Sequence, residues 1–531
     1  MKRRAFLASI AAATGEMAIL RRGFSARRLA DKIAEAKPDA AIAFHTEDAH
    51  YQDCYEHALR TLAANSQVLS PYKEPLLIEG SVYKGVWLEC APHEGLVYSP
   101  IRPEVARNNH LAFFRLQRED GQIPCNVKDA GAGFGQIQMV VPIAATSWEL
   151  AQQTNDSELL EMAYASCARW DAWLRRYRDT RGTGLCEGFC TYDTGHDNSP
   201  RWAGFPNACP DRDARKCPPV PSLPRLCPDL SATVYGGRVA LAEMARALGK
   251  KGEADRWSED AAKIRKLIVE RLYDSHDAAF YDVDAQDKFV RIRGDVITRV
   301  LGEHVVDQQL FEEIYRRQIH NSSAFWAPYP LPSIALNDPT FVRPIPRNSW
   351  GGASQALTSL RAPRWMEHYN KPSDLAHLME QWVSALLRAG DFRQQLDPLT
   401  GEFTEDPPGY SPAALVLLDF TWRLSGVREA EGRLEWNIRP MAGAQPTSFR
   451  LRAGSNATAE LRYEAGKAEL MLNGRLILRT SSTVRIVTDR DGTLRKAMGT
   501  ASVKTAVELN TSDHRVRKFT IEPNHIVQLA R

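Results

Sequence analysis

The spacing of apolar residues changes near Gly426, and this change limits most strongly the folds that the chain can adopt. Before it, apolar residues recur every three or four positions, the spacing of amphipathic helices. This spacing is clearest over residues 151–177, 232–248, 253–272 and 374–389. After it, apolar and polar residues alternate as they do in half-buried strands. The sequence therefore predicts a mainly helical region followed by a β region.

Short turns separate several of the helical segments, which predicts antiparallel helix pairs over residues 81–426. Their number favours a helical toroid over a four-helix bundle; with the resemblance described below, we expect an (α/α)6 toroid. Residues 427–531 predict an all-β domain, most simply a β-sandwich, with hairpin turns at Asn473-Gly474 and Asp491-Gly492. Residues 31–80 have a mixed pattern and receive no clear assignment.

The alternation in the β region is clearest in four short segments. These segments are residues 434–438, 459–463, 469–473 and 483–487. We expect each of them to form a strand with one face buried.

Composition excludes several classes of function. The 531 residues include 68 basic and 65 acidic ones, interspersed along the chain, for a net charge of +3. Without a basic stripe, nucleic acid is not an expected partner. No segment is long and apolar enough for a membrane span, and no obligate protein partner is evident.

The first thirty residues resemble a twin-arginine export signal. Arg3-Arg4 precede a short run of apolar and small residues, from Ala5 to Ala13. We therefore expect residues 1–30 to direct export, and the protein to be periplasmic or secreted. The alternative is a basic N-terminus on a cytoplasmic protein.

Five of the nine cysteines cluster around a long segment, 203–228, that is rich in Pro, Arg and Asp. They are Cys186, Cys190, Cys209, Cys217 and Cys227. A loop of this length in a compact domain is usually a lid or a binding loop. One or two disulfides among the five would tie it down in an oxidising compartment. A zinc site is the weaker alternative, because paired Cys-x-x-Cys spacing is missing.

The segment Thr191–Trp202 combines two carboxylates, a histidine, a turn and a tryptophan. Asp193 and Asp197 lie four residues apart, with Gly195 between them to allow a tight backbone path. Glycosidic bond cleavage needs a positioned carboxylic acid to protonate the departing oxygen, and Trp202 would offer a stacking surface for a sugar. The alternative is an ordinary capped start of a helix.

This segment resembles the general-acid motif of glycoside hydrolase family 63 and its mannosylglycerate and glucosylglycerate hydrolase relatives, which reads approximately Pro-Trp-Glu-Ser-Gly-Met-Asp-Asn-Ser-Pro. Asp193 stands at the family's glutamate and Asp197 at its catalytic aspartic acid. The resemblance covers roughly residues 80–425. It implies a glycosidase that needs neither a metal nor a cofactor, with Asp197 as general acid.

Further motifs extend the resemblance. In Trp87–His93, Glu89 matches an aspartate that holds sugar hydroxyls and His93 matches a histidine. An ordinary salt-bridged acid and a structural histidine are the alternatives. Gln117–Pro124 resembles a Gln-x-x-Asp-Gly-x-Ile-Pro turn at the rim of the site, where Gln117 is a candidate sugar ligand.

Two matches are partial. Gln138 stands at the glutamine of a Gln-Pro-Pro motif, although Met-Val follows it here. Asn348–Gly352 replaces Tyr-Trp-Arg-Gly-Pro, so Asn348 and Trp350 would line the sugar site without the family's arginine. Trp350 would stack on a sugar face.

The main departure is Gln394, which begins a segment similar to the family's Glu-x-x-Asn/Asp-Pro-x-Thr-Gly. The family's glutamate activates water, whereas an amide cannot take up the proton. Gln394 is then a sugar ligand at most. Candidate replacements are Glu405, which a Pro-Pro pair follows, and then Glu402, Asp406 and Asp397.

Asp193 has three candidate roles. It would bind sugar hydroxyls, keep Asp197 protonated through repulsion between like charges, or itself take the part of the base.

We therefore expect a glycoside hydrolase acting on an α-linked bond in a small or terminal sugar unit. The first alternative is a sugar-binding protein without catalysis, which Gln394 favours. The second is a polysaccharide lyase on the same toroid, with His93 or His196 and Tyr192 as the groups that move the proton.

Overall fold

The computed structural model describes residues 41–440, 445–453 and 457–529. The predicted export signal at residues 1–30 lies outside these ranges. The chain divides into two compact units. The larger contains residues 56–371 and 377–419, and the smaller contains the described residues within 41–55, 372–376 and 420–529.

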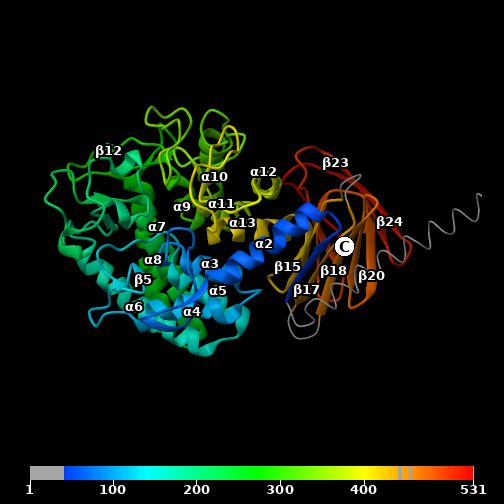
Figure 1. Cartoon of the computed structure of the whole chain (residues 1–531), viewed down its shortest axis with the longest axis horizontal. Helices are drawn as coiled ribbons and strands as arrows, with labels where there is room; N and C mark the ends of the chain where they lie inside the picture. Colours follow the sequence, from blue (N-terminus) through cyan, green and yellow to red (C-terminus); the bar gives the residue numbers. More distant parts are fainter. Residues whose placement is uncertain (1–40, 441–444, 454–456, 530–531) are drawn as a thin grey trace, which may run out of the picture. The chain divides into compact units, whose positions relative to one another are not determined.

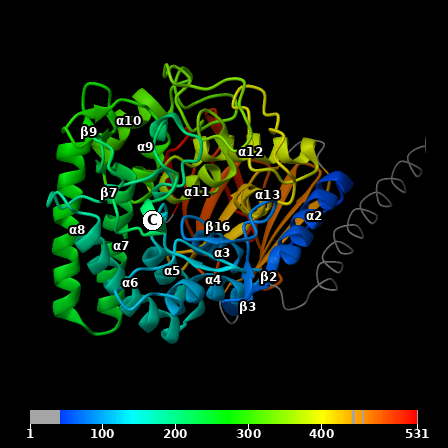
Figure 2. The same cartoon turned by 60° about the vertical axis from the view of Figure 1, so that its left-hand side comes forward.

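The larger unit is built mainly from helices, in agreement with the apolar spacing. It contains α3 (Ala91–Tyr98), α4 (Pro103–Arg115), α5 (Ile143–Thr154), α6 (Ser157–Tyr177), α7 (Pro228–Ala247), α8 (Lys251–Leu272), α9 (Val296–Gly302), α10 (Gln308–Ile314) and α11 (Ala356–Met366). Three more helices belong to both units, α2 (Ala49–Asn65), α12 (Pro372–Ala389) and α13 (Ser411–Ser425). Neighbouring helices pair closely, and α7 and α8 run side by side (Figure 2).

The apolar stretch 151–177 forms parts of two helices instead of one. Asn155 adopts a left-handed conformation with φ 53° and ends α5. Asp156 then caps α6, because its carboxylate accepts a hydrogen bond from the Leu159 N–H. The apolar period continues through this break, so the spacing alone hides it. Within the described residues, none of the helices combines the length and apolarity that a bilayer crossing requires.

Short strands frame the loops of the larger unit. A four-stranded sheet has the order β12 (Phe289–Val290), β11 (Asp282–Val283), β8 (Arg225–Leu226), β7 (Glu187–Gly188). A second sheet joins β4 (Gly85–Trp87), β5 (Asn126–Lys128) and β6 (Gly131–Gly133), and three pairs join β13 (Ser354–Gln355) to β14 (Gln395–Leu396), β9 (Tyr273–Asp274) to β10 (Ala279–Phe280), and β2 (Ser66–Leu69) to β3 (Tyr72–Leu77). These strands bring together the segments that carry the predicted site.

The smaller unit contains two antiparallel sheets. The seven-stranded sheet has the order β1 (Ile42–Thr46), β17 (Thr447–Ala453), β18 (Ala457–Glu464), β19 (Lys467–Leu472), β20 (Arg475–Thr480), β23 (Thr505–Thr511), β24 (Val516–Ile521). The five-stranded sheet has the order β15 (Val427–Ala430), β16 (Arg433–Ile438), β21 (Val484–Thr488), β22 (Leu494–Met498), β25 (Ile526–Gln528).

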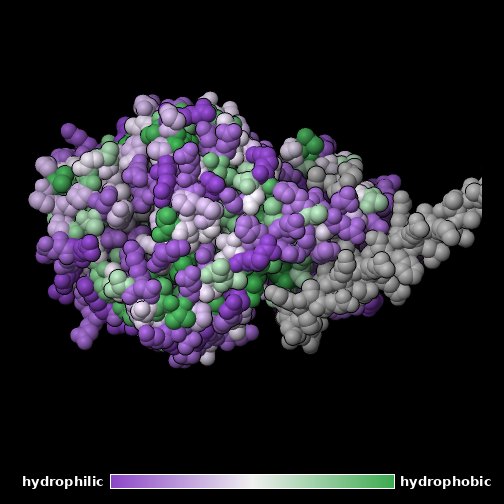
Figure 3. All heavy atoms as spheres, viewed as in Figure 1, coloured by the Kyte–Doolittle hydropathy of each residue, from purple (hydrophilic) through white to green (hydrophobic). Residues whose placement is uncertain are grey.

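The four predicted strand segments fall in β16, β18, β19 and β21. Asn473 and Gly474 have φ of 50° and 75° and join β19 to β20, which confirms the predicted hairpin turn. The N-terminal segment contributes β1, which pairs with β17 at the sheet edge (Figure 1). Hydrophilic residues cover most of the face seen in Figure 3, with hydrophobic ones interspersed.

Candidate active site

The segment Thr191–Trp202, called the acid loop from here on, forms two short 3-10 turns in place of a regular helix. They span Thr191–Asp193 and Pro200–Trp202. Between them, Gly195 and Asn198 adopt left-handed conformations with φ of 63° and 54°. The capped helix that the sequence left open as an alternative is reduced to one 3-10 turn, Pro200–Trp202, where the Ser199 hydroxyl accepts the Arg201 N–H.

Asp193 is entirely buried and holds the acid loop in place. Its carboxylate accepts hydrogen bonds from the Ile137 N–H at 2.9 Å and the Phe189 N–H at 2.7 Å. It also forms an ion pair with Arg178, whose Nη2 lies 3.1 Å from Oδ1. Both side chains are fully inaccessible to solvent. The prediction that Asp193 binds sugar hydroxyls is therefore wrong, because its acceptor positions are used within the protein. Its ion pair with the fully buried Arg178 also counts against a role as the base.

Asp197 is half-buried and remains accessible. Its Oδ2 lies 3.3 Å from the Asn348 Nδ2, and its backbone carbonyl accepts a hydrogen bond from the Trp350 N–H at 3.0 Å. Burial and the charge of Glu89 raise the pKa of Asp197 to about 7, against the smaller opposing effect of Asn348. The group is therefore protonated over much of the neutral range, as a general acid must be.

The acid that raises this pKa is Glu89, which corrects the expectation that Asp193 does so. Glu89 lies just after β4 and is buried. Its carboxylate packs against Gly195 and accepts a hydrogen bond from the Gln138 Nε2 at 3.2 Å. Gln138 has a left-handed φ of 45° and accepts a hydrogen bond from Gln136. An amide on a strained backbone thus holds Glu89 beside Asp197.

A chain of amides connects Asp197 to Gln394. Asn348 donates to Asp197 through Nδ2, and its Oδ1 accepts from the Gln394 Nε2 at 3.0 Å. The Gln394 Oε1 in turn accepts from the Tyr83 hydroxyl at 3.0 Å. The Tyr83 hydroxyl donates to Gln394 Oε1, which leaves the Gln394 Nε2 to face Asn348. The Asn348 Oδ1 accepts from it, so the Asn348 Nδ2 faces Asp197. The structure thus brings Asn348 and Gln394 together beside Asp197.

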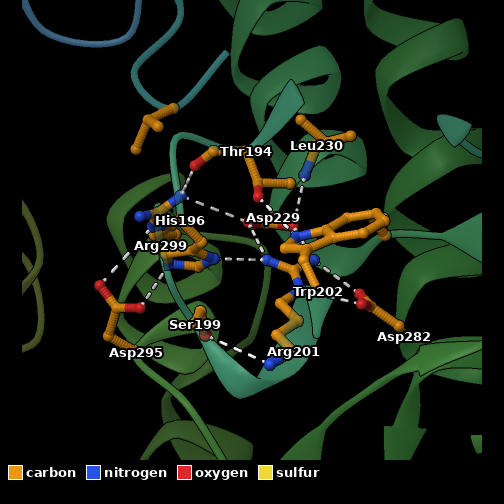
Figure 4. A network of polar contacts seen from close by, with 12 residues as sticks. Thr194, His196, Ser199, Arg201, Trp202, Asp229, Leu230, Asp282, Asp295 and Arg299 are labelled. Carbon is orange, nitrogen blue, oxygen red and sulfur yellow. Dashed lines mark hydrogen bonds and ion pairs between the residues drawn. The ribbon is translucent and has the colours of Figure 1, made fainter. Parts of the chain in front are cut away.

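A buried network of charges supports the acid loop from behind (Figure 4). Arg201 lies between two aspartates, with Nη1 2.7 Å from Asp229 Oδ2 and Nε 2.8 Å from Asp282 Oδ2. Arg299 adds a hydrogen bond to the Thr194 carbonyl at 2.6 Å. Removing one partner from such a network costs roughly 3–5 kcal/mol, because it leaves an unpaired buried charge. The network therefore fixes the backbone on both sides of Asp197.

His196 belongs to this network, and both of its ring nitrogens are engaged. Its Nδ1 accepts from Arg201 at 2.9 Å, which places the proton on Nε2, 2.7 Å from Asp295 Oδ1. Burial and the nearby Arg299 lower the pKa of His196 to about 4. His196 is thus a structural group, which counts against its use as the base of a lyase. His93, on α3, is also buried.

Residues 83–422 match the model of the mannosylglycerate hydrolase MGH1-like glycoside hydrolase domain. This match spans more than half of the chain.

The chain belongs to the MGH1-like glycoside hydrolase family.

It is therefore a glycosidase, in agreement with the resemblance read from its motifs. A comparison with curated protein sequences gives no match.

Solved structures share the fold. The GH63 mannosylglycerate hydrolase from Thermus thermophilus in complex with Tris matches 69% of this chain and 100% of its own, with a TM-score of 0.58 and 18% identity. Neutral trehalase from Saccharomyces cerevisiae matches 68% of this chain and 80% of its own, with a TM-score of 0.51 and 13% identity. The GH78 rhamnosidase of a Bacillus species matches 82% of this chain and 41% of its own, with a TM-score of 0.54 and 14% identity.

Within this MGH1-like glycosidase, the burial of the aromatic residues differs from that predicted. Trp202 is 2% exposed and donates its Nε1–H to the Thr194 hydroxyl, and Trp350 is 3% exposed in a core cluster. The prediction that these two tryptophans stack on a sugar is therefore wrong. Tyr83 and Trp87 are half-buried instead, and their rings meet edge to face at 5.8 Å.

The candidate bases differ in their surroundings. Glu405 and Glu402 are exposed. Asp406 is 3% exposed, accepts a hydrogen bond from the Asn348 N–H at 3.3 Å and lies 3.5 Å from the Arg347 Nε. Asp397 accepts the Leu399 N–H of its own turn. Asp406 and Asp197 thus both contact Asn348, an arrangement that the sequence did not single out.

Gln117 has a structural role. Its amide donates to the carbonyls of Gly121 at 2.8 Å and Ser166 at 2.9 Å, so it braces the turn and is not a sugar ligand.

The nine cysteines all lie in the described part of the chain and are free thiols.

Three groups of side chains have the spacing of metal ligands among the described residues. They are Cys190, Asp193 and Cys209; Cys227, Asp229 and Asp282; and Asp274, His276 and Asp277. In each group the carboxylates are already paired with arginines. Nothing in their chemistry therefore calls for a metal.

Two acidic residues near the site were missed by the sequence reasoning. Glu79 is buried and accepts the Tyr410 hydroxyl at 2.7 Å, and burial raises its pKa. Glu94 is completely buried, and burial raises its pKa to about 7. Glu94 directly follows His93, the last residue of the motif Trp87–His93, and that position is the signal that could have pointed to it. Glu79 lies in the unassigned segment before residue 80, where no pattern pointed to it.

Proposed function

We propose that the protein hydrolyses an α-linked glycosidic bond between a terminal sugar and a small partner, with Asp197 as the general acid. One observation carries this proposal. Asp197 is accessible, and its pKa is raised to about 7 by burial and by Glu89. A carboxylic acid that stays protonated near neutral pH can protonate the leaving oxygen.

The surroundings of Asp197 suit a sugar. Carboxylates and amides can accept from and donate to adjacent hydroxyls. Glu89 and Asn348 supply these groups beside Asp197, and Gln138 contacts Glu89. Tyr83 and Trp87 offer half-buried rings for the apolar face of the sugar. We further propose that the helices of the larger unit form the (α/α)6 toroid and that the C-terminal sheets form a β-sandwich.

Water activation requires a carboxylate, since Gln394 is an amide. In an inverting mechanism the base stands about 6.5–9.5 Å from the acid. We propose that Asp406 takes this part, in preference to our first choice, Glu405. Asp406 contacts the backbone of the residue whose side chain holds Asp197, whereas the Glu405 side chain is exposed.

The same Gln394 supports one rival function, a sugar-binding protein that no longer catalyses. Its amide is held at both ends by Asn348 and Tyr83, an arrangement that would serve binding equally well.

For the cellular location, we propose that residues 1–30 direct export of the protein to the periplasm or beyond.

The test is hydrolysis of a panel of α- and β-linked disaccharides, glycosyl-glycerates and plant-type oligosaccharides by the wild type and Asp197→Asn. We expect cleavage of an α-linked member, reduced roughly 10²–10⁴-fold in the variant. A variant within threefold of the wild type would remove Asp197 from the mechanism. Sugar binding by both proteins without any cleavage would establish the binding protein.

A further inference from the structure

Two buried thiols from different segments meet beneath the acid loop. The Sγ atoms of Cys190 and Cys209 lie 3.7 Å apart, and the two residues are 0% and 4% exposed. Cys190 immediately precedes the first 3-10 turn of the acid loop, and Cys209 immediately precedes another 3-10 turn, Pro210–Arg212. The two thiols therefore join the acid loop to the long segment 203–228.

The backbones at this junction are already aligned. The Thr191 N–H donates to the Pro206 carbonyl at 3.0 Å, and the Tyr192 N–H donates to the Asn207 carbonyl at 3.0 Å. The Cys209 N–H is held by the Gly135 carbonyl at 3.0 Å. Hydrogen bonds thus fix the main chains on both sides of the pair, and the two sulfurs, 3.7 Å apart, would have to approach to about 2.05 Å to bond.

The charges at the junction disfavour a metal as the reason for this pair. Asp193 completes a possible set of three ligands, but its carboxylate is paired with the buried Arg178. The Nη2 of Arg178 also lies 3.6 Å from the Cys209 Sγ. A cation bound by the two sulfurs would therefore face a buried guanidinium at close range.

We propose that Cys190 and Cys209 form a disulfide that closes a covalent ring around the acid loop. The bond forms by exchange with an external small disulfide. One thiolate attacks it, releasing one thiol, and the second thiolate displaces the other, so that two protein S–H bonds are exchanged for one S–S bond and two small thiols. Residues 190–209 then form the ring, which contains both Asp193 and Asp197.

The burial of both sulfurs says when the exchange takes place. An external disulfide cannot reach Cys190 while the segment 203–228 covers it, so the bond forms when this segment opens or before it closes. Cys217 packs against the pair and is half-buried, which makes it the one competing partner in the same cluster. The assignment therefore depends on showing that Cys217 stays free.

The test uses the full-length protein, incubated with oxidised glutathione both in buffer and in sub-denaturing urea. The protein is then denatured, alkylated without reductant, digested and analysed by mass spectrometry. We expect seven of the nine cysteines to be alkylated and one linked peptide pair, two hydrogens lighter, that joins Cys190 to Cys209. Nine alkylated cysteines in both conditions, or a link that uses Cys217, would overturn the proposal.

Variants provide a second measurement. Cys190→Ser and Cys209→Ser should each remove the link and lower the Tm of the oxidised protein by the same amount, and the double variant should lower it no further. Cys217→Ser is the matched control and should keep the link. Reductant should lower the Tm of the wild type and leave Cys190→Ser unchanged. An equal response of both would refute a stabilising bond.

The effect on catalysis rests on the proposed function. If Asp197 is the acid, reduction of the ring should lower kcat in the wild type and in Cys217→Ser, and have no effect on Cys190→Ser. The disulfide mapping does not depend on activity. A correct link without an effect on kcat would therefore count against the catalytic role alone.

Discussion

The carboxylate of Glu89 lies against Gly195, where an added Cβ atom would come within 1.5 Å of the Glu89 Oε2. This contact places Glu89 beside Asp197 and makes the glycine essential in two ways. The backbone has φ 63°, which other residues adopt only under strain, and the side-chain space is already filled. The charge that raises the pKa of the acid thus depends on the absence of a side chain.

Gly195→Ala should therefore reduce activity and stability together. The left-handed backbone costs roughly 1–3 kcal/mol, and the clash must displace Glu89 or the acid loop, so we expect a loss of kcat of about tenfold or more. Gly182→Ala is the matched control, because Gly182 has φ 64° and nothing within 4 Å of an added Cβ. The activity of Gly182→Ala should stay near that of the wild type. Equal losses of activity in the two variants would mean that backbone strain alone, and not the displacement of Glu89, causes the loss.

The pH profile of hydrolysis should report the pairing of Asp197 with Glu89. Only the protonated acid is active, so kcat should fall as the pH rises through about 7, the pKa of Asp197. Glu89→Gln removes the repelling charge and should move this alkaline limb to lower pH. Glu119→Gln changes an exposed acid and should leave the limb in place. An unmoved limb in Glu89→Gln would assign it to another group.

The motifs singled out the acid loop, Glu89, Gln138, Asn348 and Gln394, and the structure brings these residues together, while their roles toward a substrate stay predictions. Sequence could not assign their partners. Whether Asp193 faces a sugar or Arg178 depends on the side of the tight turn from which its side chain projects, and both directions are compatible with the same motif. The burial of Trp202 and Trp350 likewise depends on packing from distant segments. The helical and strand regions were predictable because their periodicity runs over many residues.

The choice between Asp406 and Glu405 as the base can be made by exchange of single residues. Asp406→Asn should reduce kcat by roughly 10²-fold or more, because a base is lost, while the binding of the sugar persists. Glu405→Gln alters an exposed side chain next to it and should remain within threefold of the wild type. Single-turnover rates on the substrate found in the panel provide the comparison. The reverse result would restore Glu405 as the base.

Gln394→Glu tests whether the Gln394 amide serves to position Asn348 or only marks the loss of a catalytic carboxylate at this position. A carboxylate there would face the Asn348 Oδ1, and Asn348 would have to turn its Nδ2 away from Asp197. Since that hydrogen bond lowers the pKa of Asp197, its loss should move the alkaline limb to higher pH. We expect kcat below that of the wild type at a pH well below 7, where Asp197 is protonated in both proteins, because the turned Asn348 amide no longer positions the acid. A gain in kcat would mean that a carboxylate at this position can still serve as the base and that the rival binding function describes the natural chain.

His196 should make the stability of the fold depend on pH between about 6.5 and 4. In the native state burial and Arg299 lower its pKa to about 4, whereas the unfolded chain takes up the proton near 6.5. In this window the unfolded state binds more protons, so the free energy of unfolding falls as the pH falls, by up to about 1.4 kcal/mol per pH unit for one histidine.

His196→Asn should be less stable at pH 7, because Arg201 loses an acceptor, but its free energy of unfolding should show a shallower slope with pH from 6.5 to 4. Denaturant unfolding at several pH values measures this slope. His276→Gln, an exposed control, should keep the slope of the wild type, and an equally steep slope in His196→Asn would show that His196 does not carry the effect.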